Sequence, residues 1–146
     1  MLDLDHFKAI NDTHGHPAGD RVLRSVAELL RQRLRKTDVI GRVGGEEFAV
    51  LLPDADAADA ARLLDELREA FAGVRQCNER GEFGATFSCG VVQFRPGMKT
   101  EELCALADRA LYRAKRGGRN CVLVEGGRRS RASARGEERR RGLKQA

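Results

Sequence analysis

Two adjacent carboxylates, Glu46 and Glu47, are the residues of this sequence whose setting first suggests chemistry. They follow a pair of glycines, Gly44 and Gly45, and precede an apolar run at 48–52 that predicts a buried strand. Because like charges repel in a partly desolvated site, two glutamates at the start of a buried strand imply a nearby cation. An ordinary glycine hairpin with a solvated pair of glutamates is the simpler interpretation of these residues taken alone.

A third carboxylate, Asp3, stands in residues 1–4, which resemble the end of a strand. If this strand lies beside the glycine hairpin, Asp3, Glu46 and Glu47 converge at one end of a sheet. Such hard oxygen ligands suit Mg²⁺, which usually reaches a protein together with a phosphate substrate. Gly44 and Gly45 leave the backbone bare, so a triphosphate could lie against the hairpin amides. The alternative is that Asp3 is an ordinary acid at a strand end.

The elements that must position these carboxylates follow from apolar periodicity and turn residues. Helices are predicted over 17–36, over 56–71, and from a Thr100 cap to a stop at Gly117 and Gly118; strands are predicted at 1–4, 38–42, 47–52, 83–94 and 120–124. The order of strand, helices, hairpin, helix, strand, helix, strand predicts an α+β fold. Its helices are expected to flank a mostly antiparallel sheet.

Composition and charge place these elements in one globular domain. Hydrophobic residues make up 41% of the chain and charged residues 34%, and no apolar run has the length of a membrane span. The whole chain has 27 Lys and Arg and 22 Asp and Glu, a net charge of +5. Residues 126–146 carry eight of these basic residues and two of the acidic ones, a net charge of +6. Residues 1–125 therefore have a net charge of −1 and are predicted to form the domain, followed by a basic, disordered tail. A basic nucleic-acid-binding face is not indicated.

The four cysteines form no C-x-x-C motif, which favours a reduced, cytoplasmic protein. Cys89 and Cys104 lie in apolar contexts and are predicted to be small core residues.

Four sequence blocks occur together in this chain: LDLDHFKAINDTHGHPAGD at 2–20, RVGGEEF at 42–48, FSCGVV at 87–92 and ADRALYRAKRGGRN at 107–120. In order and spacing they closely resemble the GGDEF family of diguanylate cyclases, over about residues 1–124. The resemblance implies a fold like that of nucleotidyl cyclases and polymerase palms, with a ferredoxin-like core. It also implies a reaction in which two GTP molecules form cyclic di-GMP and two pyrophosphates, each 3′-hydroxyl attacking the α-phosphate of the other GTP. A homodimer is then needed for turnover.

The resemblance also implies roles for individual residues. Asp3, Glu46 and the Leu4 carbonyl are expected to hold Mg²⁺ or Mn²⁺, with Glu47 supporting a second metal ion. Glu46 is in addition the expected base, or the group that holds the attacking hydroxyl, so Glu46 and Glu47 form the catalytic pair.

The resemblance also implies which residues contact the substrate. Asn11 and Asp20 match the pair of positions that reads guanine in the family. A carboxylate can accept both N–H groups of the guanine edge, which adenine does not offer, so ATP should be rejected. Asn11 could instead be a helix or turn cap, and Asp20 could complement a helix dipole.

Other matching positions are His16, which contacts substrate, and Lys8, Lys115 and Arg119, which contact phosphate. Lys115 and Arg119 flank the glycine stop of a helix, where they could equally complement the helix dipole.

An R-x-x-D motif, Arg35 to Asp38, matches the position of an inhibitory site that binds the product. Arginine suits such a site because its planar fork grips a phosphate or a guanine edge. As a bare motif, R-x-x-D is more usually a surface ion pair.

The sequence departs from the family pattern at three places. Glu46 stands where many members have Asp, and His6 replaces a common aromatic or apolar residue. Family domains also begin some tens of residues earlier, so residues 1–125 are predicted to lack the N-terminal helix and part of a central first strand. The chain is therefore interpreted as a fragment, a truncated gene product or a product of a mis-assigned start.

Two alternative functions stay open. A truncated, catalytically weak domain could act as a binding module for GTP or cyclic di-GMP. The arginine-rich tail could instead act on a nucleic acid or a membrane surface.

Overall fold

The computed structural model describes residues 1–126. The predicted tail, 126–146, lies outside the described residues except for Gly126. Among residues 1–126, no helix has both the length and the apolar character needed to cross a membrane.

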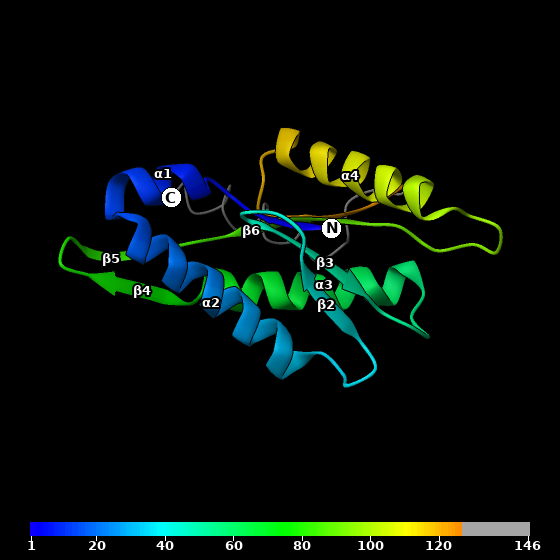
Figure 1. Cartoon of the computed structure of the whole chain (residues 1–146), viewed down its shortest axis with the longest axis horizontal. Helices are drawn as coiled ribbons and strands as arrows, with labels where there is room; N and C mark the ends of the chain where they lie inside the picture. The colour runs from blue at the N-terminus through cyan, green and yellow to red at the C-terminus, as the bar shows by residue number, and fades with distance from the viewer. Residues whose placement is uncertain (127–146) are drawn as a thin grey trace, which may run out of the picture.

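The described chain forms a five-stranded sheet, a separate two-stranded sheet and four helices (Figure 1). In chain order the elements are β1 (Leu2–Leu4), α1 (Phe7–His14), α2 (His16–Arg33), β2 (Val39–Arg42), β3 (Glu47–Leu51), α3 (Ala57–Ala72), β4 (Arg75–Asn78), β5 (Gly81–Gly84), β6 (Phe87–Val91), α4 (Thr100–Arg116) and β7 (Val122–Val124). The larger sheet has the order β2-β3-β1-β6-β7, and only its β6–β7 pair is parallel. The predicted α+β class with a mostly antiparallel sheet is confirmed.

The first strand occupies the centre of the larger sheet. It pairs antiparallel with β3 on one side and with β6 on the other, so it lies beside the glycine hairpin, which is the condition under which the three carboxylates converge. Leu2 and Leu4 point into the main core and are almost completely buried. Because strand side chains alternate, Asp3 between them must point to the opposite face of the sheet.

The helices lie on both faces of the sheet (Figure 1). Side chains of α1, α2 and α3 join those of β1, β3 and β6 in the main core, whose largest buried members include Phe71, Phe87 and Leu30. Helix α4 covers the other face, where Ala114 packs with Cys121 and Leu123 in a smaller cluster. The sheet therefore separates a large core from a thin layer of small side chains under α4.

Gly90 allows α4 to lie close against β6. A Cβ atom at Gly90 would lie 2.3 Å from the Ala107 carbonyl oxygen and 2.4 Å from the Leu111 amide nitrogen. Both are backbone atoms of a helix, so the clash cannot be relieved by turning a side chain. The FSCGVV block thus contains a glycine that is required for space.

We therefore expect Gly90→Ala to lower the free energy of unfolding by about 1–3 kcal/mol, the usual range for overpacking a well-packed core. Urea unfolding followed by circular dichroism measures the change. Gly84→Ala is the matched control, because a Cβ atom there meets nothing within 4 Å. Equal stability of the two variants would contradict the close approach of α4.

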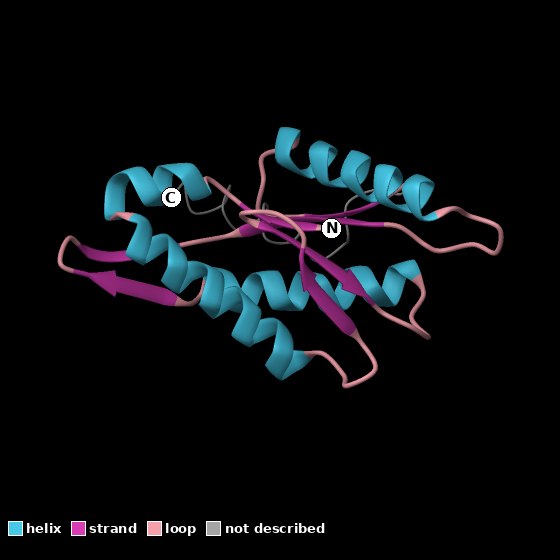
Figure 2. Cartoon of the chain, viewed as in Figure 1, coloured by secondary structure: helices cyan, strands magenta, loops and turns pink. Residues whose placement is uncertain are grey.

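The structure corrects three predictions. The predicted strand 83–94 is two strands, because β5 turns back along β4 as a separate hairpin beside α1 and α2 (Figure 2). Thr100 is the first residue of α4 and not its cap: Lys99 holds the cap position, and no side chain caps the helix there. Cys104 is exposed, at the rim of α4 where it lines an apolar pocket, whereas Cys89 is buried as predicted.

Helix boundaries also differ from the predicted ones. Gly15, with φ of +85°, separates α1 from α2, and α2 runs from His16 to Arg33 instead of over 17–36. The left-handed conformation at Gly15 is one that glycine adopts without strain.

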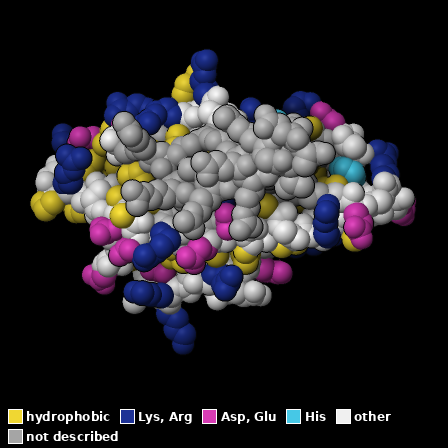
Figure 3. All heavy atoms as spheres, turned by 180° about the vertical axis from the view of Figure 1, so that it is seen from behind, with side chains coloured by type: hydrophobic (Ala, Val, Ile, Leu, Met, Phe, Trp, Pro, Cys, Tyr) yellow, Lys and Arg dark blue, Asp and Glu magenta, His cyan; other side chains and the backbone are white. Residues whose placement is uncertain are grey.

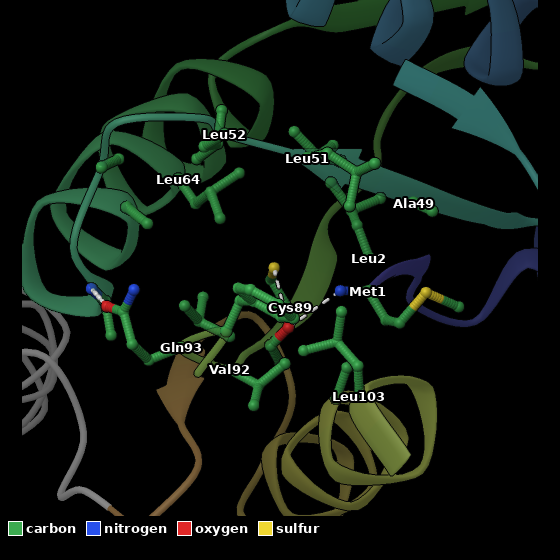
Figure 4. Close-up of a pocket in the computed structure, with 18 of the residues that line it drawn as sticks. Met1, Leu2, Ala49, Leu51, Leu52, Leu64, Cys89, Val92, Gln93 and Leu103 are labelled. Carbon is green, nitrogen blue, oxygen red and sulfur yellow. Dashed lines mark hydrogen bonds between the residues drawn. The ribbon is translucent and has the colours of Figure 1, made fainter. Parts of the chain in front are cut away.

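An apolar pocket of about 410 Å³ opens beside Met1 (Figure 4). Leu51, Leu52 and Leu64 line one side of it, and Leu103 lines another. The Met1 ammonium group donates a hydrogen bond to the Gly90 carbonyl oxygen at 2.8 Å. None of the predicted site residues line this pocket, whose walls are mainly apolar.

Surface charges of the two signs are mixed. Where side chains are visible on the face shown in Figure 3, Lys and Arg are interspersed with Asp and Glu. This agrees with the nearly neutral charge of residues 1–125.

Candidate active site

The pairing of β1 with β3 brings the predicted carboxylates together at one end of the larger sheet. Asp3 lies directly opposite Glu47 in the antiparallel register, and the Leu4 amide donates to the Glu46 carbonyl oxygen at 3.2 Å. Glu46 is thus the residue that joins the glycine turn to β3. Strand register alone places the three acids at adjacent positions.

The glycine turn between β2 and β3 is fixed by Arg42, for which the sequence suggested no role. Its guanidinium donates to the Gly44 carbonyl oxygen at 3.2 Å and to the Gly45 carbonyl oxygen at 2.7 Å. A Cβ atom at Gly44 would lie 2.6 Å from Glu47 Oε2, whereas one at Gly45 would meet nothing within 4 Å. Gly44 thus leaves room for the Glu47 carboxylate to lie against the turn.

Asp3 is buried and faces a lysine from the far end of the chain. Lys115 Nζ, on the last turn of α4, lies 2.7 Å from Asp3 Oδ1. This oxygen is buried, and Lys115 is the charged partner that lies against it. Burial raises the pKa of Asp3 above its usual value, although the neighbouring Lys115 opposes the shift. The effect of burial is the larger of the two.

Glu46 shares this crowded negative environment. Burial raises the pKa of its carboxyl group, and the charges of Asp3 and Glu47 raise it further, while Lys115 lowers it. A carboxyl group whose pKa is raised accepts a proton more readily than an ordinary one does. A cation placed among these acids would favour their charged forms.

The donor set of this site fits a Mg²⁺ ion that is held together with a substrate. Among residues 1–126, no three His, Cys, Asp or Glu side chains form a metal site by themselves. Mg²⁺ usually binds through one or two carboxylates together with waters and substrate phosphates. Asp3, whose Oδ1 is buried, and Glu46 supply that number of carboxylates.

Two of the predicted phosphate-contacting residues lie at this site, and one does not. Lys115 contacts Asp3, and Arg119 lies close enough to help lower the pKa of Asp3. Lys8 is exposed and pairs with Asp12 of its own helix at 2.7 Å.

The predicted guanine-reading pair lies where α1 meets α2. Asn11 Oδ1 is buried and has no hydrogen-bond partner, and a Cβ atom at Gly19 would lie 2.0 Å from it. Gly19 therefore makes room for the Asn11 carboxamide next to Asp20. Asp20 itself is exposed, and so is His16 at the start of α2.

The hairpin of β4 and β5, which the sequence analysis missed, supports this corner. The His14 ring stacks on Phe83 at a centroid distance of 4.0 Å. Asn78 donates to the His14 carbonyl oxygen at 3.3 Å, and Arg80 donates to the Thr13 carbonyl oxygen. Asn78 pairs with Gly81 across a two-residue turn, Glu79-Arg80, and these two residues are not the Asn, Asp or Gly types that predict a tight hairpin.

Arg35 and Asp38 form a turn between α2 and β2. Asp38 Oδ2 accepts from the Arg35 amide at 2.7 Å, and the Asp38 amide donates to the Arg35 carbonyl oxygen at 3.0 Å. Within residues 1–126 the two side chains form no ion pair, so the usual surface ion pair is not what the motif makes here. The turn lines a polar pocket of about 600 Å³ together with Arg62 and Glu66 of α3.

One further acid escaped the sequence analysis. Asp5 is 3% exposed and accepts hydrogen bonds from Ser88 Oγ, Thr86 Oγ1 and the Asn120 amide. Its position two residues after Asp3, on the same strand end, was the available signal.

Comparisons with known proteins point to one family. A family model described as "Diguanylate cyclase, GGDEF domain" matches residues 1–121. Diguanylate cyclase DgcP of Pseudomonas aeruginosa is 47% identical over 124 residues, which cover 85% of this chain and 18% of that protein. The probable diguanylate cyclase DgcT of Escherichia coli is 42% identical over 129 residues, covering 85% of this chain and 28% of that protein. The chain thus spans less than a third of the length of these relatives.

Solved structures give the same picture for the fold. The GGDEF domain of DgcB from Caulobacter crescentus in complex with c-di-GMP has a TM-score of 0.82 and 36% identity, covering 86% of this chain and 75% of that one. The active GGEEF domain of a diguanylate cyclase from Vibrio cholerae has a TM-score of 0.78 and 34% identity. The match covers 85% of this chain and 79% of that one. These similarities confirm the predicted cyclase-like, palm-like fold.

Proposed function

This chain belongs to the GGDEF domain family of diguanylate cyclases, and on that premise we propose that it condenses two GTP molecules into cyclic di-GMP with release of two pyrophosphates. The observation that most directly supports this activity is the pairing of β1 with the glycine hairpin. It sets Asp3 opposite Glu47 and places Glu46 in the same negative cluster, next to Lys115.

Asp3, Glu46 and the Leu4 carbonyl would hold the Mg²⁺ or Mn²⁺ ion, and Glu47 would support a second one. When bound, the metal supplies a Lewis acid that stabilises charge on the attacking and leaving oxygens. Glu46 accepts the proton of the attacking 3′-hydroxyl, a role that the raised pKa of its carboxyl group favours. Lys115 and Arg119 bind the phosphates and stabilise the negative charge of the departing pyrophosphate.

Guanine would be read at the corner of α1 and α2. The Asp20 carboxylate accepts from the guanine edge, and the unpartnered Oδ1 of Asn11 supports a role for its carboxamide in contacting the base. His16 and Lys8, both exposed on the same two helices, contact the remainder of the nucleotide.

The proposed reaction is tested by incubating the chain with GTP and Mg²⁺ and separating the products by chromatography. Cyclic di-GMP and pyrophosphate in a ratio of one to two support the cyclase. The alternative is a binding module that holds GTP or cyclic di-GMP without turnover. Saturable binding of either nucleotide with no product formed would favour that module and reject the cyclase.

Turnover should require two chains. The product has two identical halves, so two sites must face each other, each holding one GTP, in a two-fold dimer. We expect the rate per chain to rise with protein concentration until the dimer is saturated. A rate per chain that stays constant from the dilute monomer upward, as checked by light scattering on the same samples, would contradict the dimer requirement.

We further propose that the product inhibits the enzyme at Arg35 and Asp38. The polar pocket beside their turn, which Arg62 also lines, supports this proposal. The Asp38 carboxylate accepts the Arg35 amide, which fixes the turn and leaves the Arg35 guanidinium outside any ion pair with Asp38.

Arg35→Ala should weaken binding of cyclic di-GMP by about 1–3 kcal/mol, the scale of a lost charge-assisted hydrogen bond. Isothermal titration measures the affinity, and progress curves should stay linear for longer than those of the unmutated chain. The initial rate should change little, because Arg35 lies outside the cluster around Asp3. Arg33→Ala, at the exposed end of α2, is the control. Unchanged product inhibition would show that the turn has no such role.

A further inference from the structure

The turn that carries Arg119 has an unusual backbone. Gly118, Arg119 and Asn120 follow one another with φ angles of +109°, +61° and +46°. Residues other than glycine rarely adopt such angles, and two in succession persist only when the surrounding structure holds them. The turn lies between α4, which carries Lys115, and β7.

Three hydrogen bonds hold this turn. The Arg119 amide donates to the Ala114 carbonyl oxygen at 3.1 Å, which ties the turn to α4. The Asn120 amide donates to Asp5 Oδ2 at 2.9 Å, and Asn120 Oδ1 accepts from Arg68 at 2.9 Å. Asn120 is thus fixed through both its backbone and its side chain.

Both partners of Asn120 are themselves buried and anchored. Arg68 of α3 donates through Nε to Asp65 at 2.6 Å, and the two side chains are 8% and 1% exposed. The other carboxylate oxygen of Asp5 accepts from Ser88 Oγ at 2.7 Å. Neither partner can therefore move freely with the turn.

Asp5 also connects the turn to the metal-binding end of β1. It lies two residues beyond Asp3, and its own amide donates to the Thr86 carbonyl oxygen at 2.8 Å. The same carboxylate therefore fixes both the end of the strand that carries Asp3 and the turn that carries Arg119. If these buried groups served stability alone, an apolar replacement of similar size would serve as well.

We propose that Asp5 and Asn120 are positioning residues, which hold Arg119 and Lys115 facing Asp3 where the phosphates of GTP would lie. This role rests on the proposed function. Neither residue touches the reacting atoms in this arrangement. They act by fixing the orientation of the turn, and with it the positions of the Arg119 and Lys115 side chains.

The test compares two substitutions at Asn120. Asn120→Gly removes the hydrogen bond to Arg68 but tolerates the left-handed backbone, so the fold should survive. Asn120→Asp keeps an oxygen for Arg68 and also tolerates this conformation. Gln93→Ala is the control, because it removes a hydrogen bond to the Ala57 amide of α3 and touches neither Asp5 nor the turn.

The readout is the dissociation constant for GTP and for guanosine, which has no phosphate, measured by titration with Mg²⁺ present. Asn120→Gly should bind GTP about tenfold more weakly, as for the loss of one charge-assisted contact, and guanosine as the unmutated chain does. Asn120→Asp should restore GTP binding to within about threefold of the unmutated chain. Gln93→Ala should leave the ratio of the two constants unchanged.

Two outcomes would overturn the positioning role. In one, Asn120→Gly binds GTP as tightly as the unmutated chain does. In the other, the variant loses GTP and guanosine binding equally, as a general loosening of the fold would produce. If the unmutated chain itself binds GTP no more tightly than guanosine, the proposed function fails first, and the positioning role fails with it.

Discussion

Asp3→Asn and Glu46→Gln should each lower the rate of cyclic di-GMP formation by on the order of a thousandfold, the scale of losing a group that acts on the charges of the transition state. Each substitution removes one of the two carboxylates that fit the Mg²⁺ ion, and Glu46→Gln also removes the proposed base. Product formation from GTP with excess Mg²⁺ measures the loss. Glu101→Gln, on the exposed first turn of α4, is the control.

The same Glu46 variant should be more stable than the unmutated chain at pH 7 without metal. Burial and the charges of Asp3 and Glu47 raise the pKa of Glu46, so the folded state prefers its uncharged form. The protonated carboxyl group makes its full contribution to the free energy of unfolding at pH values below the pKa of the unfolded state. This contribution is lost as the pH rises through the higher pKa of the folded state. Glutamine copies the uncharged form, so its advantage should disappear as the pH falls below the unfolded-state pKa.

Thermal unfolding at several pH values measures this difference. A lower unfolding temperature for Glu46→Gln at pH 7 would contradict the account of repulsion. Near-normal turnover in either the Asp3 or the Glu46 variant would reject the assignment of these residues to the metal and the reaction.

Substitution of Asp20 should have the other large effect, on the choice between GTP and ATP. A site that hydrogen-bonds a substrate edge can reject an analogue without that edge by on the order of 10⁴, because the bound analogue covers the site's polar groups and leaves them unpaired. Asp20→Ala removes the acceptor of the guanine N–H groups, so the ratio of kcat/KM for GTP to that for ATP should fall by about a hundredfold or more. Rates with each nucleotide at matched concentrations give the ratio.

Gly19→Ala tests the same site without touching a ligand-binding group. Its Cβ atom would lie 2.0 Å from Asn11 Oδ1, so the carboxamide must move away from Asp20. The selectivity ratio should fall while the helix content is kept, since alanine favours a helix. Thr13→Ala, exposed on α1, should change neither. A Gly19→Ala chain with unchanged selectivity would show that Asn11 does not read the base.

Much of the local structure could be predicted from the sequence. Apolar periodicity located the cores of α2, α3 and α4, and the glycine pair located the hairpin between β2 and β3. These features depend on residues a few positions apart, where one face of a helix or strand is already visible in the residue order. The error at β4 and β5 had a local cause: the polar residues of the hairpin gave no alternating pattern, so only Phe83 and its neighbours suggested a strand.

Side-chain partners far apart in the chain could not be predicted in this way. The pairing of Lys115 with Asp3, the bond from Asn120 to Asp5 and the contact of Gly90 with α4 all depend on strand order and register. Register is decided by the burial of a whole face at once, and no single residue carries that information.

The sequence by itself determined the family, the chemical types at the site and the helices and strands that carry them, because motifs and periodicity are properties of residue order. The tertiary structure alone decided that β1 lies between β3 and β6, which sets Asp3 opposite Glu47 and within reach of Lys115. It also decided that Asp5 is a buried acceptor for a left-handed turn and that Cys104 is exposed. The physical reason is that burial and long-range hydrogen bonding come from packing two sides of one sheet together, and a side chain acquires its neighbours only when that packing is complete.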